Sequence, residues 1–464
     1  MTARVAVVGG GLAGITAALG CADAGHRVTL FESRNRLGGL TYSFDRAGLA
    51  VDNGQHVFLR CCDRYRALLA RLGVESDVNL QERLDIPVRG PLLDPATDGA
   101  GSPVVSGRLR RLPVPAPLHL SWALLRYPWI STAARARFVR AALALRAVDA
   151  DDPRTDDTSF GDWLRAHGQD RAAIESLWEL VGIATLNARA DDVSLALAAT
   201  VFQIGLLTRS DAADIGWSRI PLGRLHGEAA QRALAAAGVA VVTRAKVAGI
   251  QRNGNGWAIS VDGDTAAADA VVFAVPPDAA ATLLPPDSVG LPSNWAVALD
   301  SSPIINVHAV YDRTVMTEPF LAGLETDAQW VFDRTAASGL GDTATGGQYL
   351  AVSVSAADDL VDLPTAELRH RFLPALHRLL PATRTAQVRD FFVTRERHAT
   401  FRPAPGSARL RPTARTALPG LYLAGAWTAT GWPATMEGAV RSGESAVAEL
   451  VSDHARTPAA EVVR

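Results

Sequence analysis

The 464-residue sequence is poor in cysteine and in lysine. Its three cysteines, Cys21, Cys61 and Cys62, are too few for a disulfide framework and are typical of a reducing compartment. The adjacent pair Cys61 and Cys62 is best interpreted as small buried residues, with redox activity as the alternative. Lys246 is the single lysine, so arginine carries almost all of the positive charge.

The sequence also lacks an excess of either charge and a long apolar run. Its 46 basic and 48 acidic residues nearly balance, which gives no reason to expect a nucleic acid partner. No uninterrupted apolar stretch reaches the roughly 18 residues that a transmembrane helix needs, so we expect a cytoplasmic protein whose membrane contact is at most peripheral. A signal peptide is disfavoured because the N-terminal segment has no continuous apolar centre.

What the sequence does contain is a glycine turn at its start. A short apolar run at residues 4–8 leads through this turn into an alanine-rich helical segment. Gly9 permits the tight turn, Gly11 lets backbone approach a pyrophosphate, and Gly14 allows strand and helix to pack closely, with the helix N-terminus facing the phosphates. The predicted phosphate-binding residues are Gly9, Gly11, Leu12, Ala13 and Gly14.

A second strand pattern ends in an acid, Glu32, eighteen residues after Gly14. An acid at this place binds a pair of ribose hydroxyls in dinucleotide-binding domains. The following loop contains arginines and two glycines, which suit the surroundings of a phosphate. The further cofactor-binding candidates in this run are Ser33, Arg34, Arg36, Gly38 and Gly39.

The whole run resembles the extended FAD fingerprint of the amine oxidase and phytoene desaturase superfamily, which favours FAD as the cofactor. The resemblance implies an α/β protein with a Rossmann-like FAD-binding domain of the glutathione-reductase type, interleaved with an α+β substrate domain. We expect the FAD-binding domain to comprise 1–75, 220–288 and 411–452, the substrate-binding domain 76–219 and 289–410, and a disordered tail 453–464.

The segment 45–58 is predicted to form a hairpin that ends near the flavin. In the superfamily that it resembles, the corresponding stretch runs along the isoalloxazine ring. Asn53, Gly54 and Gln55 are therefore cofactor-binding candidates, and Gln55 and His56 are candidate catalytic groups. A buried, hydrogen-bonded structural histidine is the alternative for His56.

The C-terminal part contains a predicted strand at 420–428 and a run, 429–443, that leads into a helix. A helix N-terminus beside N1 and the C2 carbonyl of a flavin would stabilise the anionic reduced ring. Trp427 is a third catalytic candidate, with plain core packing as the alternative. The cofactor-binding candidates here are Gly425, Ala426, Thr435, Met436, Glu437 and Ala439, and the resemblance adds the backbone of Val247, beside the adenine.

Between these parts, residues 108–146 carry eight arginines and no acid, interleaved with leucine, tryptophan and tyrosine. Such a basic amphipathic segment suits the surface of an anionic bilayer, or an exposed helical pair with its tryptophans turned inward. Helices expected near 160–164 and 177–182, and the apolar run 193–207, form either the wall of a long apolar tunnel or plain core.

Residues 52–56 and 427–443 resemble one branch of the superfamily, the hydroxysqualene dehydroxylases. The resemblance implies that a C30 allylic alcohol loses its hydroxyl as water while reduced flavin gives a hydride, leaving squalene for hopanoid synthesis. Ionisation needs a proton donor, for which His56 is the first candidate. Only one glycine fingerprint is present, so the electrons must come from diffusing NAD(P)H or a separate reductase.

Two other functions stay open at this point. The first is a carotenoid-type desaturase that removes hydrogen from a polyprenyl chain. The second is a non-catalytic FAD-binding escort protein for isoprenoids, favoured by Ala426 where the superfamily has aspartate. Amine oxidation is disfavoured, because Lys246 falls in a predicted strand of the nucleotide domain and not near the flavin.

Overall fold

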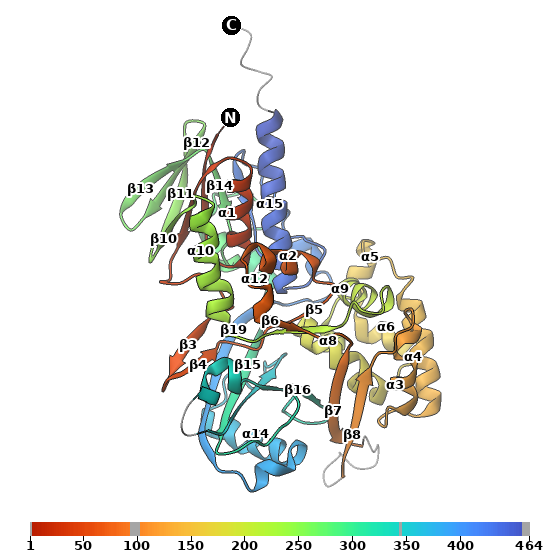
Figure 1. Cartoon of the computed structure of the whole chain (residues 1–464). Coiled ribbons are helices and arrows are strands. Elements are labelled where there is room, and N and C mark those ends of the chain that lie inside the picture. The colour runs from red at the N-terminus through yellow and green to blue at the C-terminus, as the bar shows by residue number, and fades with distance from the viewer. Residues whose placement is uncertain (1, 93–102, 343–345, 457–464) are drawn as a thin grey trace.

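In the computed structural model, which describes residues 2–92, 103–342 and 346–456, both ends of the chain contribute to one parallel sheet (Figure 1). Its strands are parallel throughout, as expected where helices cover both faces. The predicted α/β class is confirmed. The strand order is β10 (Ala240–Thr243), β2 (Arg27–Glu32), β1 (Arg4–Val8), β14 (Ala270–Phe273) and β20 (Leu421–Leu423).

The first and last long helices lie against each other beside this sheet (Figure 1). They are α1 (Leu12–Asp23) and α15 (Met436–Arg456). A Cβ on Gly443 of α15 would lie 2.4 Å from the carbonyl oxygen of Ala13, so the two backbones touch. Residues 453–456 of the tail predicted at 453–464 belong to α15, which continues to Arg456, and 457–464 lies outside the described residues.

Smaller elements complete this part of the molecule. Helices α10 (Ala229–Ala236) and α2 (Asp63–Arg71) contact α1 and α15 respectively. An antiparallel sheet contains β11 (Val247–Asn253), β12 (Gly256–Val261) and β13 (Asp264–Ala268). The hairpin of β3 (Ser43–Arg46) and β4 (Leu49–Asp52) then leads toward the second part of the molecule.

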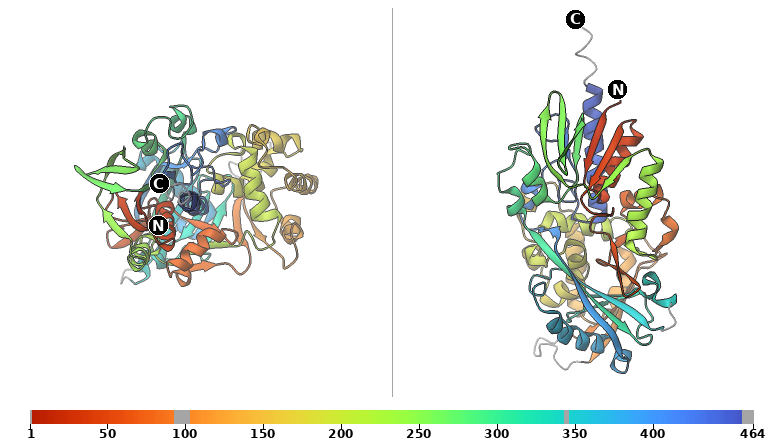
Figure 2. Two further views of the ribbon diagram at one scale, coloured as in Figure 1. Left: turned by 90° about the horizontal axis from the view of Figure 1, so that it is seen from above. Right: turned by 90° about the vertical axis from the view of Figure 1, so that its left-hand side faces the viewer.

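The second part is built on a mixed seven-stranded sheet, whose two long strands cross the lower half of Figure 2, right. Helix α14 (Thr365–Leu379) covers it with Leu368, Phe372 and Leu376, which share one helical face. The strand order is β19 (Val388–Phe401), β15 (Ser301–Tyr311), β18 (Gln348–Val354), β17 (Trp330–Asp333), β16 (Phe320–Gly323), β7 (Asp85–Pro91) and β8 (Val104–Arg110). Strands β7 and β8 belong to the expected α+β substrate domain, but no strand was predicted at their positions.

A helical lobe lies beside this sheet (Figure 1). Its centre is an aromatic cluster of Phe160, Trp178 and Phe202, with ring centroids 5.1–5.7 Å apart. These three side chains are at most 3% exposed, so they form core and do not wall a tunnel. The helices include α3 (Ser121–Arg126), α4 (Thr132–Leu145), α6 (Phe160–Ala166), α8 (Glu179–Leu186) and α9 (Leu195–Phe202).

A short antiparallel sheet connects the two parts. It consists of β5 (Val57–Leu59), β9 (Ile215–Ser218) and β6 (Val78–Leu80). Strand β5 follows the hairpin directly, and β9 begins where the chain returns from the helical lobe. Among the helices of the described residues, none is both long and apolar enough to cross a bilayer.

The contact between α1 and α15 can be tested with one methyl group. We expect Gly443→Ala to destabilise the protein by about 1–3 kcal/mol, because the new Cβ would overlap the Ala13 carbonyl. Gly182→Ala, also in a helix, should be neutral or stabilise by up to about 1 kcal/mol, because its nearest neighbour would be Phe202 at 4.0 Å. Urea unfolding measures the difference in stability between the two variants. Equal unfolding midpoints for Gly443→Ala and Gly182→Ala would contradict the close contact between α1 and α15.

Candidate active site

The turn after β1 is closed by its own backbone. Gly9 donates its N–H to the carbonyl of Phe31 over 2.8 Å and has a φ of +107°. A Cβ on Gly14 would lie 1.9 Å from the carbonyl oxygen of Gly9, so α1 approaches the strand only because no side chain is there. A Cβ on Gly11 would meet only the Cα of Gly39, at 3.8 Å. Gly11 therefore borders open space.

This space lies at the N-terminus of α1. No side chain caps the helix at Gly11, and no acid occurs in its first turn. Leu12 and Ala13 form that turn, with their side chains buried at 5% exposure each. Uncapped backbone N–H groups and the helix dipole suit an anionic group such as a phosphate.

Glu32 connects the glycine turn to the loop after β2. Its Oε2 accepts a hydrogen bond from the Gly10 N–H at 2.7 Å. Its Oε1 accepts from the Arg34 N–H at 2.6 Å and from the Ser33 hydroxyl at 3.2 Å. A carboxylate has about four lone-pair sites, so it can accept further bonds from ribose hydroxyls.

Arg36, Gly38 and Gly39 lie beside the same turn. The Gly38 N–H donates to the Gly10 carbonyl at 2.9 Å, and both glycines have positive φ, at +101° and +59°. Arg36 donates from Nη1 to the Gly39 carbonyl at 2.9 Å, with its guanidinium 3.5 Å from the centre of the Tyr42 ring. Burial lowers the pKa of Arg36 from its ordinary value.

The hairpin ends in a buried carboxylate, Asp52, that joins three segments. Its Oδ1 accepts from the Ser43 hydroxyl at 2.6 Å and the Leu222 N–H at 2.9 Å. Its Oδ2 accepts from Arg334, which comes from the second part of the molecule, at 2.7 Å. Arg334 also donates to the Ser218 carbonyl at 2.8 Å. Sequence reasoning missed Arg334, because no local motif marks it.

Asn53 and Gly54 follow, held against the seven-stranded sheet. The Asn53 carbonyl accepts from Asn306 of β15 at 3.2 Å and from the Thr394 hydroxyl of β19 at 3.0 Å. Within the described residues, the side-chain oxygen of Asn306 is buried without a partner. This backbone is therefore fixed, and an unused acceptor lies next to it.

Gln55 and His56 line a small cavity. Its other walls include Trp217 and Phe332, and the Asp52 and Arg334 pair borders it. The Gln55 side-chain nitrogen is buried and has no partner among the described residues, as expected for a group that meets a ligand. Sequence reasoning missed Trp217 and Phe332, since isolated aromatics in distant strands carry no local signal.

Burial lowers the pKa of His56 below its usual value near 6.5, and the charge of Asp52 opposes this shift only in part. The imidazole is therefore neutral at pH 7. In this neutral form one ring nitrogen carries the proton and can donate a hydrogen bond, and the other can only accept one.

A second histidine, His226, lies close to His56. It is fully buried and forms a hydrogen bond of 2.8 Å between Nε2 and the Tyr65 hydroxyl. Burial, with a smaller contribution from His56, lowers the pKa of His226 to about 3. Sequence reasoning did not single out either His226 or Tyr65.

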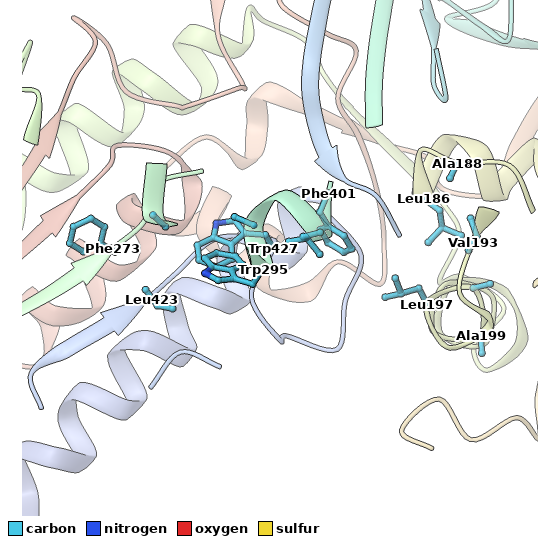
Figure 3. Packing of buried hydrophobic residues seen from close by; sticks show 14 of the residues in the cluster. Leu186, Ala188, Val193, Leu197, Ala199, Phe273, Trp295, Phe401, Leu423 and Trp427 are labelled. Atoms are coloured by element: carbon cyan, nitrogen blue, oxygen red, sulfur yellow. The ribbon is translucent and has the colours of Figure 1, made fainter. Parts of the chain in front are cut away.

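The C-terminal strand ends at Gly425, whose φ is +143°. A Cβ there would lie 2.3 Å from the indole nitrogen of Trp427. Trp427 stacks on Trp295 with ring centroids 5.2 Å apart (Figure 3) and donates to the Val275 carbonyl at 2.9 Å. It is 5% exposed, so core packing accounts for it without a role at the reacting carbon.

Arg411 holds the loop that follows, and sequence reasoning missed it. Its guanidinium donates to the carbonyls of Thr428 at 2.6 Å, Trp432 at 2.8 Å and Ala426 at 3.3 Å. Burial lowers the pKa of Arg411 to about 10, which still leaves it charged at neutral pH. The backbone at Ala426 therefore has a fixed place although its side chain is a methyl group.

Three candidates at the start of α15 serve the fold. Thr435 accepts the Gly438 N–H at 3.1 Å, and Met436 and Ala439 pack against the core around α1. The fourth, Glu437, is 1% exposed and accepts from the Tyr65 N–H at 2.7 Å, which caps α2. Its carboxylate is thus used within the protein, at the end of the helix that carries Tyr65.

Val247 begins β11, with its backbone paired to Val261 and its side chain 5% exposed. Its neighbour Lys246 is exposed and lies between β10 and β11. The single lysine of the chain is therefore in the nucleotide-binding part.

Taken together, the residues fit a dinucleotide with a flavin ring. Gly11 leaves room at an uncapped helix N-terminus, and Glu32 stands at the end of the adjacent strand. Unpartnered polar atoms of Gln55 and Asn306 lie where the two parts of the molecule meet.

Comparisons with known proteins agree with this geometry. A family described as flavin containing amine oxidoreductase matches residues 12–451. The chain is 27% identical to hydroxysqualene dehydroxylase of Sinorhizobium fredii over 461 residues, covering 98% of this chain and 99% of that protein. It is 26% identical to the chloroplastic/chromoplastic zeta-carotene desaturase of Zea mays over 488 residues, covering 95% and 82%. Cyclohexylamine oxidase from Brevibacterium oxydans shares the fold, with a TM-score of 0.70 at 18% identity over 98% and 100%.

The open space at Gly11 predicts that a methyl group would harm the cofactor more than the fold. We expect Gly11→Ala to keep its circular dichroism spectrum while its FAD content at a limiting FAD concentration falls by about tenfold or more. Gly14→Ala should lose both the native circular dichroism spectrum and the bound FAD, because its Cβ would overlap the Gly9 carbonyl. Gly249→Ala, with nothing within 4 Å, should keep both. Equal flavin absorbance for Gly11→Ala and Gly249→Ala would contradict this site.

The buried His226 predicts a loss of stability in acid. Its pKa is about 3 in the folded protein and near 6.5 when unfolded, so only the unfolded chain takes up the proton between these values. Stability is complete above pH 6.5 and is lost as the pH falls toward 3, by about 1.4 kcal/mol per pH unit for this group. We expect His226→Gln to reduce the pH dependence of the urea midpoint between pH 6.5 and 4.5, whereas His370→Gln, at an exposed position, should not.

Proposed function

The chain belongs to the flavin-containing amine oxidoreductase family and is an FAD-dependent oxidoreductase, and from this premise we propose that it reductively removes the hydroxyl group of hydroxysqualene to give squalene. Hydroxysqualene dehydroxylases of two species support the proposal, at 27% and 28% identity over nearly the full length of both chains. In this role the protein would act in hopanoid or isoprenoid biosynthesis.

The observation that carries the proposal is His56 beside an aromatic-walled cavity. Loss of a hydroxyl group from an allylic alcohol needs a proton donor at the leaving oxygen, which a desaturase does not need. Trp217 and Phe332 line the same cavity, and aromatic side chains there would suit the cation that forms as the C–O bond breaks. Gln55, whose buried amide nitrogen has no partner among the described residues, would orient the substrate or the cofactor.

We assign the FAD contacts by the same geometry. The backbone at Gly11, Leu12 and Ala13 would hold the pyrophosphate with help from Arg36, and Glu32 the ribose. Asn53, Gly54 and Gln55 would border the flavin ring, and reduced FAD would supply the hydride that the reaction consumes. The remaining contacts are proposed from the sequence motifs and the family resemblance alone, and they are Gly9, Gly14, Ser33, Arg34, Gly38, Gly39, Val247, Gly425, Ala426, Thr435, Met436, Glu437 and Ala439.

In the proposed step, the protonated, imidazolium form of His56 gives a proton to the hydroxyl oxygen, and the C–O bond breaks so that water leaves. The carbon then receives a hydride with its electron pair, so one alcohol, one proton and one hydride become one hydrocarbon and one water. The cavity walls exclude solvent, which would otherwise return the cation to alcohol. The electrons come from outside the chain, either from NAD(P)H or from a separate reductase. A peripheral position on the inner face of the membrane would give access to the apolar substrate.

A polyprenyl desaturase is the second candidate. Zeta-carotene desaturases are 25–26% identical to the chain, which is as similar as the dehydroxylases. In that reaction the hydride would move in the opposite direction, from the hydrocarbon to oxidised FAD.

A non-catalytic escort protein is supported only by Ala426. The Arg411 contacts fix the loop around Ala426 without a carboxylate there, which weakens that support.

The reaction can be tested directly with the purified holoprotein. We expect anaerobic incubation with hydroxysqualene and reduced FAD to yield squalene, detected by mass spectrometry, and oxidised FAD to yield none. Conversion of a polyprenyl hydrocarbon to a more unsaturated product with oxidised FAD would favour the desaturase instead. No product in either direction would leave the escort function as the remaining candidate.

His56 also predicts the pH dependence of the reaction. Because its pKa lies below 6.5, its protonated fraction rises as the pH falls from 8 toward 5. We expect kcat/KM for squalene formation to rise up to about tenfold per pH unit over the part of this range above that pKa. His56→Gln should lower kcat by about 100-fold or more and remove this dependence while FAD stays bound. A His56→Gln variant with an unchanged pH profile would exclude His56 as the donor.

A further inference from the structure

We propose that the outer face of the segment Leu118–Leu143 docks on an anionic lipid bilayer. This docking face is defined by five exposed apolar side chains together with three arginines nearby. The five apolar residues are Leu118, Trp122, Leu125, Val139 and Leu143, and the three arginines are Arg126, Arg140 and Arg146. The inference goes beyond the proposed reaction, because it concerns a surface and not the cavity at His56.

The apolar residues are unusually open to solvent for their type. Leu118 is 64% exposed, Leu125 58%, and Trp122 48%, whereas the core around them is closed. Val139 and Leu143 of α4 are 47% and 49% exposed. Single exposed apolar residues are normal, but several on adjoining elements mark an interaction site.

The spacing shows that these residues form outward faces and not frayed ends. On α4, Val139 and Leu143 are four residues apart and Arg140 lies between them, on the same side of the helix. On α3, Trp122 and Leu125 are three residues apart. Figure 1 places both helices at the outer edge of the helical lobe.

The inner faces of the same elements are firmly attached. Ala123, Tyr127, Trp129 and Ala134 are at most 6% exposed and pack with β7 and β8. The Tyr127 hydroxyl donates to the Ser176 carbonyl at 2.7 Å. The docking face is therefore presented by a rigid base, so no helix needs to unfold in order to bind.

The charges around this docking face favour an anionic partner. Within the described residues, no ion pair to an acid is found for Arg126, Arg140 or Arg146, and 107–147 contains no acid at all. Arg126 lies over the Trp122 ring at 4.2 Å, which places a cation beside an aromatic that favours the bilayer interface. Apolar residues with tryptophan and free arginines fit a surface of anionic phospholipid headgroups.

A protein partner or a second copy of this chain would need acids that complement these arginines. The bilayer supplies both anionic headgroups and an apolar layer beneath them, so one occupant accounts for the whole surface. The same contact would hold the protein at the bilayer, in which a long hydrocarbon substrate dissolves.

The test is co-sedimentation of the full-length holoprotein with sucrose-loaded vesicles. We expect vesicles of phosphatidylcholine with 30% phosphatidylglycerol, a composition chosen for charge, to bind the protein about tenfold or more tightly than phosphatidylcholine alone. The triple variant Leu118→Ser, Trp122→Ser, Leu125→Ser should weaken binding by about tenfold or more. A second variant, Arg126→Gln, Arg140→Gln, Arg146→Gln, should remove the preference for anionic vesicles.

The matched control is Val297→Ser, which changes the most exposed large apolar side chain, at 78%, outside this surface. It should bind as the wild type does. Equal binding of the triple serine variant and the wild type would overturn the proposal, as would a concentration-dependent dimer in light scattering that the serine variant abolishes. Squalene formation from detergent-dispersed substrate should be unchanged in both docking-face variants, which separates this proposal from the proposed reaction.

Discussion

The buried ion pair between Asp52 and Arg334 is the interaction on which the arrangement of the site depends. The two side chains are 5% and 8% exposed, and burial at that level costs several kcal/mol per charge unless every lone pair and donor is used. Here the Ser43 hydroxyl, the Leu222 N–H and the Ser218 carbonyl complete the set. Because these partners come from separate segments, the pair is satisfied only when the nucleotide-binding part and the substrate sheet have one relative position. Gln55 and His56 lie three and four residues after Asp52, so their backbone is positioned by this pair.

The glycines around α1 impose a second constraint, which concerns how closely the backbones of neighbouring elements approach each other. Gly14 and Gly443 leave space for backbone on either side of α1, so the first and last helices and β1 meet without side chains between them. Glu32 then fixes the loop that follows β2 through two backbone N–H groups. On the side of the turn away from these contacts, Gly11 borders open space.

The contrast between these two constraints explains what the sequence could predict. The glycines, Glu32 and the C-terminal Gly425 belong to contiguous motifs. The spacing within each motif is typical of one backbone arrangement, so the fold class and the FAD cofactor could be predicted from them. Arg334, Trp217 and Phe332 come from strands far apart in the chain, and each is unmarked by its neighbours. Strands β7 and β8 were missed because proline and arginine conceal their alternation. For the segment that contains Trp178 a tunnel wall and plain core were both open, and the structure shows core. Apolar periodicity alone does not distinguish a cavity wall from a packed interior.

Ala426 shows why a departure from a family pattern has to be judged on the structure. A carboxylate at this position could serve a ligand, the loop or both, and the sequence does not separate these roles. In the structure, Arg411 stabilises the loop. Its guanidinium donates hydrogen bonds to carbonyls along the turn from Ala426 to Trp432. A buried guanidinium with carbonyl partners keeps its charge, as its pKa near 10 indicates, and it needs no carboxylate at 426 to stay in place. The alanine at 426 therefore leaves the backbone of this loop in place.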